Sequence, residues 1–450
     1  TNCEVDYVIA ASDAIEEAIA QKYEVGEETV DNMLQEFTES EIQFEDTESV
    51  VEEFSDDPND APVIRLVTLI ISDAVQARAS DIHVEPMGNR LRIRYRIDGI
   101  CHEMESPPKR LQNSIIARLK LMARMKLAEK RRPQDGRIPM VVQGRALDLR
   151  VSDIPTTDGE SIVMRILDKE SAKVGLVELG FHPTDMERFE GIIRRPNGIF
   201  LVTGPTGSGK TTTLYSALNA LNRPDTKIIT AEDPIEYTFP GINQSEVRME
   251  IKRTFPVILR AMLRQAPQII LVGEIRDEET AEIAVRAALT GHLVFSTLHT
   301  NDAPSAVPRL IDMGVPPYMV ASSVQAIMAQ RLVGTICPNC KEPCEVPEGT
   351  LRAVGLTAEE VEGITFYHGR GCNRCNGTGL YGRSGIFELM EMNSDLRNLI
   401  FSKAPTGEIR EKARSYGMLT LREDGLRKAI QGKTTIEEVL RVTGAVTGRN

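Results

Sequence analysis

One glycine-rich octapeptide constrains the fold of this chain more than any other feature of its sequence. Residues 204–211 are Gly-Pro-Thr-Gly-Ser-Gly-Lys-Thr, and they match the phosphate-loop pattern G-x-x-x-x-G-K-[ST] at every defined position. An apolar run at 200–202 precedes the octapeptide, and a helical pattern begins at Lys210. A strand, this loop and a helix in that order predict an α/β domain that binds the phosphates of a nucleotide.

The chemistry expected of the octapeptide follows from its residue types. Glycines let backbone N–H groups surround a phosphate, and the start of the helix adds a favourable field. Lys210 is expected to reach the β- and γ-phosphates, and the hydroxyl of Thr211 to bind Mg²⁺. A chance glycine-rich turn is the alternative, and the flanking strand and helix argue against it. The predicted nucleotide-binding residues are Gly204, Pro205, Thr206, Gly207, Ser208, Gly209, Lys210 and Thr211.

The C-terminal part of the chain alternates strand and helix patterns. Further apolar strands are predicted at 227–230, 269–272 and 293–296, and helical stretches separate them. Strands that alternate with helices predict a parallel sheet covered on both faces. We expect this α/β domain to span residues 181–450 and to end in short helices over 385–445.

A smaller α+β domain is predicted over residues 61–172, followed by a linker over 173–180. Residues 91–97 alternate between apolar residues and arginines, which predicts a half-buried strand. Asp98 and Gly99 supply a hairpin turn after it. The other expected elements are a helix from residue 61, a strand at 81–85, a helix over about 109–127, and strands near 138–143, 146–153 and 161–167.

The charge of the chain is divided unevenly. The net charge is −13, but residues 1–60 alone hold 20 acidic residues and a single base, Lys22. We expect residues 1–25 to be the tail of a truncated domain and residues 26–60 to be an acidic linker. The rest of the chain is close to neutral, so it lacks the strongly basic composition of a nucleic-acid-binding protein, and no nucleic-acid partner is expected.

No segment of the sequence has the pattern of a membrane span or a secretion signal. The chain has no run of about 18 apolar residues, and its first ten residues lack the basic and then apolar order of a signal peptide. Because the chain begins with Thr1 rather than methionine, we expect a cytosolic fragment that lacks its own N-terminus.

Four of the seven cysteines occur in two C-x-x-C pairs, which predicts a metal site. The pairs are Cys337 with Cys340 and Cys372 with Cys375. In a cytosolic chain, this spacing is typical of a tetrahedral site in which four cysteines bind zinc. Four unrelated buried thiols are the alternative, and Cys344 is a nearby fifth thiol that could compete. We expect a zinc module over residues 335–382.

Acidic residues follow two of the predicted strands. Glu232, Asp233 and Glu236 come directly after one strand, and Glu274 ends the next. Parallel-sheet proteins bind ligands at the carboxyl ends of their strands, so these carboxylates could face the γ-phosphate and orient the attacking water. A solvated loop and a simple strand cap are the alternatives.

Two histidines flank the strand predicted at 293–296: His292 precedes it and His299 follows it. A lone histidine is more often structural than catalytic. Two histidines beside a nucleotide site could instead sense the γ-phosphate.

Taken together, these strings resemble the secretion-ATPase family of type II secretion and type IV pilus systems. The family's motifs are matched by residues 204–211, 232–236, 273–277 and 291–300 in the second domain, and by 80–85, 132–137 and 149–152 in the first. The resemblance covers about residues 61–445. It implies ATP hydrolysis by a RecA-like domain with a parallel sheet, preceded by a smaller, PAS-like α+β domain.

The resemblance implies roles in ATP hydrolysis for four residues already singled out. Glu236 would be the catalytic carboxylate that polarises water. Glu274 would support Mg²⁺ and the γ-phosphate, and His292 and His299 would act as sensors of that phosphate.

The resemblance also implies an assembly and its partners. The family forms hexamers, and Arg150 and Arg165 would be arginine fingers that reach the nucleotide of a neighbouring subunit. The hexamer would push on an inner-membrane platform protein from the cytoplasmic side. Cytoplasmic components of the machine would bind the N-terminal domain that this chain lacks. The implied cofactors are ATP, Mg²⁺ and Zn²⁺.

Within the family, the four-cysteine insertion resembles the pilus-extension and type II secretion ATPases, whereas the pilus retraction ATPases lack it. We therefore expect a type IV pilus assembly motor, with a type II secretion motor as the alternative. Two interpretations from other classes stay open at this point. One is a RecA-like DNA translocase, and the other is a scaffold that binds ATP without turnover.

Overall fold

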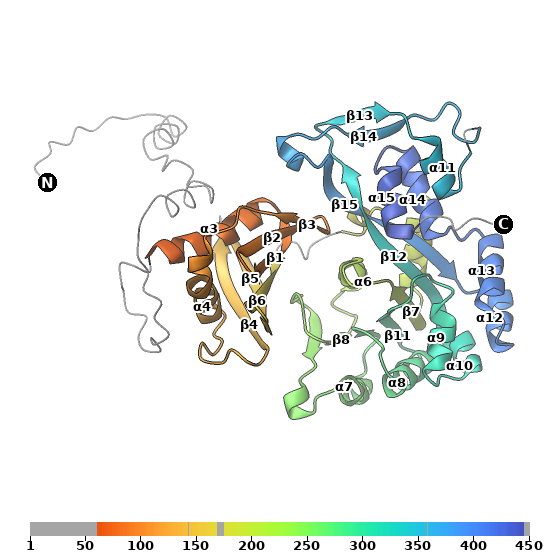
Figure 1. Cartoon of the computed structure of the whole chain (residues 1–450). Helices are drawn as coiled ribbons and strands as arrows, with labels where there is room; N and C mark the ends of the chain where they lie inside the picture. Colours follow the sequence, from red (N-terminus) through yellow and green to blue (C-terminus); the bar gives the residue numbers. More distant parts are fainter. Residues whose placement is uncertain (1–60, 143, 169–174, 358, 445–450) are drawn as a thin grey trace, which may run out of the picture. The chain divides into compact units, whose positions relative to one another are not determined.

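The structure is a computed structural model that describes residues 61–142, 144–168, 175–357 and 359–444. The chain divides into two compact units, one ending at Lys169 and one beginning at Glu170 (Figure 1). The domain boundaries predicted at 172 and 181 stay predictions. The predicted domain tail and acidic linker lie in residues 1–60, outside the described residues.

The first unit is a six-stranded antiparallel sheet with its apolar face against two helices. Its elements are α3 (Ala61–Gln76), β1 (Ala79–Pro86), β2 (Leu91–Ile97), β3 (Ile100–Glu103), the 3₁₀ turn η1 (Lys109–Leu111), α4 (Gln112–Met122), β4 (Gln134–Val142), β5 (Arg145–Thr156) and β6 (Gly159–Asp168). The strand order is β3-β2-β1-β6-β5-β4. Apolar side chains of α3, α4 and alternate strand positions form one core.

The alternation in β2 sets which face of this sheet is buried. Leu91, Ile93 and Tyr95 point into the core, and the arginines between them lie on the other face. The hydroxyl of Tyr95 donates to the backbone oxygen of Ile70 at 2.8 Å, which ties the strand to α3. The predicted half-buried strand over 91–97 is therefore confirmed.

Two boundaries in this unit differ from the sequence-based expectation. The second helix ends at Met122 rather than near 127, because Arg124 adopts a left-handed conformation (φ 57°) and reverses the chain. The strand expected from 138 already begins at Gln134, and β3 follows the predicted hairpin turn.

The second unit is built around a seven-stranded sheet of order β15-β12-β7-β11-β10-β8-β9. Its strands are β7 (Gly198–Thr203), β8 (Ile228–Glu232), β9 (Ile242–Glu246), β10 (Ile269–Val272), β11 (Leu293–Leu298), β12 (Val324–Ile336) and β15 (Leu380–Glu391), and β13 (Lys341–Cys344) and β14 (Phe366–Gly369) form a separate pair. All pairings in the main sheet are parallel except β12 with β15.

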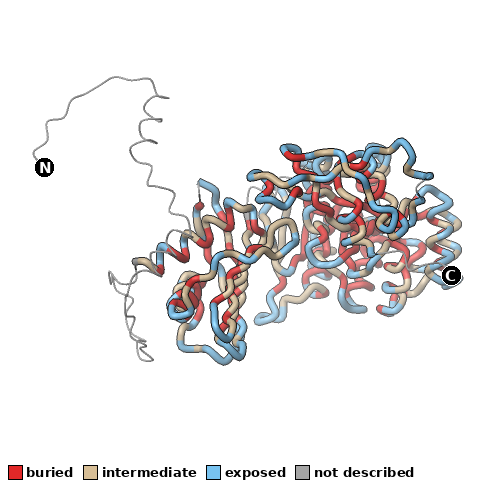
Figure 2. Tube along the Cα trace, turned by 45° about the horizontal axis from the view of Figure 1, so that its top comes forward, coloured by how far each residue is buried: buried red, intermediate tan, exposed pale blue. Residues whose placement is uncertain are grey.

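Helices cover both faces of this sheet, as predicted for a parallel sheet. One face packs on η3 (Leu176–Leu179), α5 (Pro183–Ile193) and α6 (Lys210–Leu221), and the other on α7 (Phe255–Met262), α8 (Glu278–Leu289), α9 (Ala306–Asp312), α10 (Pro317–Ser323), α12 (Ser394–Phe401) and α13 (Thr406–Ser415). The helices α11 (Glu348–Val354), α14 (Leu421–Ile430) and α15 (Ile436–Thr443), with β14, form a smaller core. The remaining elements are the 3₁₀ turns η4 (Met249–Ile251), η5 (Leu263–Gln265) and η6 (Asn373–Cys375). Figure 2 shows the buried residues gathered in the interior of each unit.

The expectation of short helices over 385–445 is wrong for its first seven residues. Residues 385–391 belong to β15, which pairs antiparallel with β12, and the first helix after it begins at Ser394. A short apolar run such as this one has no periodicity that separates a buried strand from a buried helix. Among the described residues, no helix has the length and apolar content that crossing a bilayer requires.

Candidate nucleotide site and four-cysteine cluster

The phosphate loop connects β7 to α6, as the sequence predicts. Gly204 (φ 148°) and Gly209 (φ 85°) adopt backbone conformations that favour glycine. A Cβ at Gly204 would lie 2.5 Å from the backbone oxygen of Gln330, and one at Gly209 would lie 2.8 Å from Nε2 of Gln330. A side chain at Gly204 would therefore collide with the backbone of β12, and one at Gly209 would have to displace the Gln330 side chain.

The start of α6 offers the features that bind a phosphate. Gly209 is the N-cap of this helix and provides no side-chain capping hydrogen bond. The first N–H groups of a helix lack partners within the helix, and together with its dipole they attract anions. The hydroxyl oxygen of Ser208 is buried and has no hydrogen-bond partner among the residues that the structure describes. The phosphate loop, the uncapped helix and this hydroxyl all fit a nucleotide's phosphates.

Lys210 is folded back onto its own loop. Its Nζ donates to the backbone oxygens of Gly204 at 2.8 Å and Pro205 at 2.9 Å. Burial lowers the pKa of this ammonium group, the charge of Glu274 opposes the shift, and the charge of Arg331 adds to it. The ammonium group is thus held over the loop, within the electrostatic reach of Glu274.

Three neighbouring parallel strands bring further predicted residues to the edge of the sheet that carries the loop. β7, β11 and β10 lie side by side, so the segments that follow them leave the sheet at the same edge. Glu274 follows β10 and His299 follows β11. Nε2 of His299 lies 3.4 Å from Oε2 of Glu274, and Nε of Arg276 lies 2.6 Å from the same oxygen. The structure therefore brings together the phosphate loop, Glu274 and His299.

Threonine hydroxyls hold these segments against one another. Thr203, the last residue of β7, accepts the N–H of Thr300 at 2.8 Å, and the two hydroxyl oxygens lie 2.7 Å apart. Thr297 donates to the backbone oxygen of Gly273 at 2.7 Å. Contacts between neighbouring strands thus fix the positions of the segments after β10 and β11.

The acidic segment after β8 has a buried and an exposed part. Glu232 is buried, and its carboxylate accepts hydrogen bonds from the hydroxyls of Tyr215 and Thr230 and, at 3.1 Å, from Nε2 of Gln244. Glu236 is exposed. Burial raises the pKa of Tyr215, and the charges of Glu232 and Glu236 raise it further. Glu232 is therefore held in the interior by three donors, and a role at the γ-phosphate stays a prediction for the other carboxylates of the segment.

His292 lies at the opposite edge of the sheet from the phosphate loop. Its backbone oxygen accepts the N–H of Gly198, the first residue of β7, at 3.1 Å. Its Nδ1 lies 3.0 Å from the backbone oxygen of Ala287 at the end of α8. The six residues of β11, roughly 20 Å of strand, separate it from the loop edge. Within one chain, the structure does not bring His292 to the phosphate loop, and its role as a sensor of the γ-phosphate stays a prediction.

Arg150 and Arg165 lie in the first unit, directly opposite each other on neighbouring strands. Arg150 on β5 pairs in register with Arg165 on β6, and Arg137 on β4 pairs with Arg150 on its other side. Asp81 on β1 is the register partner of Arg165 and accepts its Nε at 3.0 Å. The register therefore places three arginines in one row across β4, β5 and β6.

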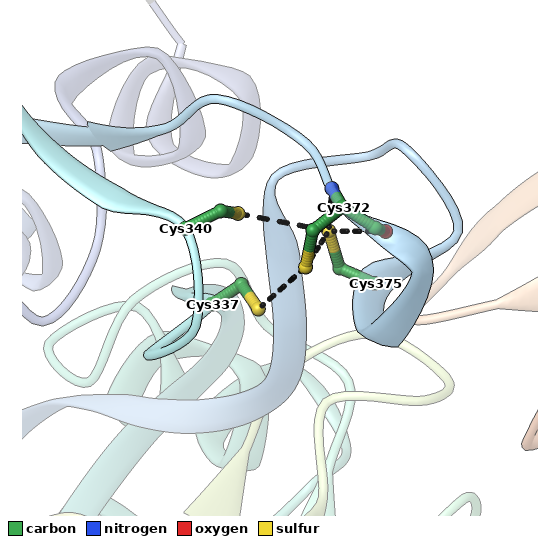
Figure 3. A group of neighbouring side chains, drawn as sticks. All are labelled: Cys337, Cys340, Cys372 and Cys375. Atoms are coloured by element: carbon green, nitrogen blue, oxygen red, sulfur yellow. Dashed lines mark hydrogen bonds between the residues drawn. The ribbon is translucent and has the colours of Figure 1, made fainter.

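The four predicted cysteines converge in one cluster (Figure 3). The sulfur atoms all lie within 4.8 Å of one another, and three pairs are separated by 3.7–3.8 Å. Four sulfurs bound to one zinc ion at about 2.3 Å would lie about 3.8 Å apart in a tetrahedron. The described part of the chain holds one such group, and it contains the two C-x-x-C pairs and not Cys344.

Hydrogen bonds around the cluster favour thiolates. Asn339 Nδ2 donates to the sulfur of Cys372 at 3.4 Å, and the N–H groups of Gly371 and Gly379 each donate to a cysteine sulfur at 3.3 Å. The Asn339 amide, with the neighbouring cysteines, lowers the pKa of Cys372 to about 6. Burial raises the pKa of Cys340 to about 12, so the hydrogen bonds favour a thiolate at Cys372 and oppose the effect of burial at Cys340. Donors of this kind support metal-binding thiolates. The residues present therefore fit a tetrahedral metal ion.

Two residues that no sequence motif indicates also lie against the phosphate loop. Oε1 of Gln330 on β12 accepts the hydroxyl of Thr213 on α6 at 2.8 Å, and its backbone forms one wall of the loop. Arg331 follows it in the same strand. Their proximity to the loop depends on the pairing of β12 with β7, which a local sequence pattern does not reveal.

A family model described as "Type II/IV secretion system protein" matches residues 56–441 of the chain. The chain belongs to this family. It is 47% identical over 443 residues to the type IV pilus assembly ATPase PilB of Myxococcus xanthus, an alignment that covers 98% of this chain and 78% of that protein. It is 50% identical over 394 residues to the type II secretion system protein E of Xanthomonas campestris, covering 87% of this chain and 69% of that protein.

Solved structures have the same fold. The crystal structure of the pilus retraction motor PilT with bound ADP is 28% identical, with a TM-score of 0.56, and the match covers 83% of this chain and 96% of PilT. The ATPase DotB of Legionella pneumophila is 20% identical, with a TM-score of 0.61, over 84% of this chain and 95% of DotB. The α/β fold preceded by a smaller antiparallel sheet is thus a PilT-like ATPase fold.

Proposed function

We propose that this chain hydrolyses ATP as the motor of a type IV pilus assembly machine. The observation that carries the proposal is the phosphate loop, in which Gly204 leaves no room for a side chain and Lys210 is held over the loop. Glu274 and His299 share its edge of the sheet. Membership of the secretion family, and the ADP on PilT at 28% identity, support an adenine nucleotide as the ligand.

In this proposal, the backbone of residues 204–211 and Lys210 bind the phosphates, and Thr211 holds Mg²⁺. The bound ion supplies positive charge to the β- and γ-phosphate oxygens. Glu236, exposed in the segment after β8, accepts a proton from the attacking water and orients it. Because Glu232 is occupied by three donors, Glu236 is the better candidate in this segment.

Glu274 and His299 have a different part in the proposal. Glu274 already holds Arg276 and His299 through one carboxylate oxygen. These contacts let it respond to a γ-phosphate and pass the change to the segment after β11. Arg150 and Arg165 would complete the site as fingers from a neighbouring subunit of a homohexamer.

The assembly partners and the location are also part of the proposal. The homohexamer would lie in the cytoplasm at the inner membrane and act on the platform protein of the pilus machine. Other cytoplasmic components would bind an N-terminal domain. The two domains that move relative to each other would be residues 61–172 and 181–450.

A type II secretion motor is the second candidate. The identities to the pilus assembly ATPase and to the secretion protein are close, at 47% and 50%. The match to the pilus protein extends over 98% of this chain, compared with 87% for the secretion protein, and this favours pilus assembly.

Two measurements test the proposal. The purified chain is expected to release phosphate from ATP only when Mg²⁺ is present. When this chain replaces the matching segment of PilB in Myxococcus xanthus, the hybrid protein should restore pili. When it replaces the matching segment of the Xanthomonas campestris secretion protein, the hybrid should not restore secretion. Absence of phosphate release would contradict ATP turnover. Restored secretion without restored pili would favour the secretion motor.

We expect one zinc ion per chain, held by the four-cysteine cluster. Structural zinc sites bind with apparent free energies on the order of 10 kcal/mol, so its loss should loosen the segment around it. Replacing Cys372 and Cys375 together with serine should remove the zinc and raise hydrogen exchange over residues 335–382. The phosphate loop lies outside this segment and should still bind nucleotide.

A matched control for the zinc prediction is Cys344→Ser, which changes a thiol outside the cluster. That variant should keep one zinc per chain by elemental analysis. Zinc retained after the double replacement, or no zinc in the unchanged chain, would show that the cluster is not its site.

A further inference from the structure

Arg331 lies beside the phosphate loop, on the strand β12 that neighbours β7. β12 runs parallel to β7, and Ala329 is the register partner of Thr203, the last residue before the loop. Arg331 follows two residues later, so it extends past the end of β7 alongside the loop. The preceding residue, Gln330, forms the wall that a Cβ at Gly204 would strike. Nothing in the proposed catalytic machinery uses this arginine.

One nitrogen of the Arg331 guanidinium group makes a hydrogen bond, whereas another nitrogen makes none within the described residues. Its Nη2 donates to Oδ1 of Asn301 at 3.1 Å. Asn301 belongs to the segment after β11 that also carries His299. The Nε of Arg331 is buried, and no hydrogen-bond partner for it lies within the described residues. Because a buried N–H of a charged group is costly to leave unpaired, this donor needs a partner from outside the described chain.

Arg331 also lacks the carboxylate that neighbouring arginines have. Arg276 lies 2.6 Å from Glu274, and Arg410 lies 2.9 Å from Asp302. In the described part of the chain, no carboxylate lies within 4.0 Å of the Arg331 guanidinium. Burial lowers the pKa of Arg331, and its charge in turn lowers the pKa of Lys210. The cations Arg331 and Lys210 therefore lie within electrostatic reach of each other beside the loop.

We propose that Arg331 binds a phosphate oxygen of the nucleotide held by its own chain, next to Lys210. The planar guanidinium suits a phosphate, and an anion between Arg331 and Lys210 would remove the repulsion between them. The inference rests on the proposed function, since it assumes a nucleoside triphosphate in the loop. It adds a second cation within the same chain, distinct from the fingers expected from a neighbour.

The test compares nucleotide affinities by calorimetry in the full chain. Arg331→Gln should weaken binding of a non-hydrolysable ATP analogue about tenfold or more, because a hydrogen bond to a charged group is lost. The affinity of Arg331→Gln for ADP should fall less than its affinity for the ATP analogue. Arg331→Lys should recover part of the lost affinity for the ATP analogue. Arg397→Gln is the matched control: Arg397 is also half-buried with a lowered pKa, but it donates to Ala321 and Gln325 at the other end of β12.

Wild-type affinity for the ATP analogue in Arg331→Gln would overturn the proposal, and so would equal losses for ADP and the ATP analogue. Unchanged affinity with loss of assembly would instead mean that a carboxylate of another subunit is the partner. If Arg331→Gln does not fold, Asn301→Ala is the alternative variant, because it removes the amide that holds Arg331. It should also weaken binding of the ATP analogue. Unchanged affinity of Asn301→Ala for the ATP analogue would contradict the proposal. If the chain without any substitution binds no ATP, the proposed function itself is refuted.

Discussion

Replacing Glu236 with glutamine is expected to leave ATP bound but to lower kcat by about 10²- to 10⁴-fold, the range that a positioned general base contributes. The carboxylate of Glu236 serves only the attacking water in the proposed mechanism, whereas the phosphate contacts come from the loop and from Lys210. The two quantities to measure are the rate of phosphate release and the affinity for ATP. Their separation is the informative result, because a damaged fold would lower both.

Two variants frame this experiment. Lys210→Ala removes a phosphate contact that is made before hydrolysis begins, so it should abolish turnover and weaken ATP binding together. Glu232→Gln is the matched control within the same acidic segment. Its side chain is buried against Tyr215, Thr230 and Gln244, so the change should affect stability more than kcat. Wild-type turnover in Glu236→Gln would assign the water to another carboxylate, most directly Glu274.

The elements that sequence predicts best in this chain are those whose chemistry is local. The phosphate loop needs a strand, a glycine turn and a helix within about a dozen residues, and all three are present around residues 204–211. The two C-x-x-C pairs likewise predict a cluster, because each pair already places two sulfurs close together. Short-range spacing carries the information in both cases.

What sequence could not predict depends on strand pairing. Residues 385–391 form a strand only because β12 offers a partner over their whole length. His292 looks equivalent to His299 in the sequence, yet the direction of β11 places the two at opposite edges of the sheet. Arg331 comes near the loop only through the register of β12 with β7. Each of these positions depends on pairing between strands that are distant in the sequence.

The side-chain environment of Glu232 shows the same limit. Its three partners come from α6, from its own strand and from β9, and no spacing in the sequence links them. A motif of three carboxylates therefore predicts a site without telling which carboxylate faces solvent. Burial separates Glu232 from Glu236, and burial is a property of the folded chain.

The second large effect concerns the row of arginines in the first unit. Mixing Arg150→Ala chains with Lys210→Ala chains is expected to restore ATP hydrolysis that neither variant shows alone. If Arg150 acts on a neighbour's nucleotide, a site is complete wherever an Arg150→Ala chain binds ATP and its neighbour is a Lys210→Ala chain that supplies the finger. In a random equal mixture, about one interface in four of a ring has this order.

The physical reason for a finger is the charge that develops during phosphoryl transfer. That charge spreads over the γ-phosphoryl oxygens, and a guanidinium placed there accelerates the reaction by about 10³-fold or more. Arg165 and Arg137 flank Arg150 in one register row, which in the proposed hexamer would present three guanidinium groups to a neighbour's polyphosphate. The ion pair of Arg165 with Asp81 is an ordinary structural contact and does not by itself require this role.

The control for the mixing experiment is Arg94→Ala, an arginine on the same face of the sheet that is bound to Glu85 at 2.7 Å. Since Arg94 lies outside the row, this variant should hydrolyse ATP alone. If the mixed rings stay inactive while both variants assemble and Arg150→Ala still binds ATP, then Arg150 does not act across the interface. Recovered activity in the mixture would mean that Arg150 and Lys210 of different chains form one composite site, because no single chain in the mixture carries both residues.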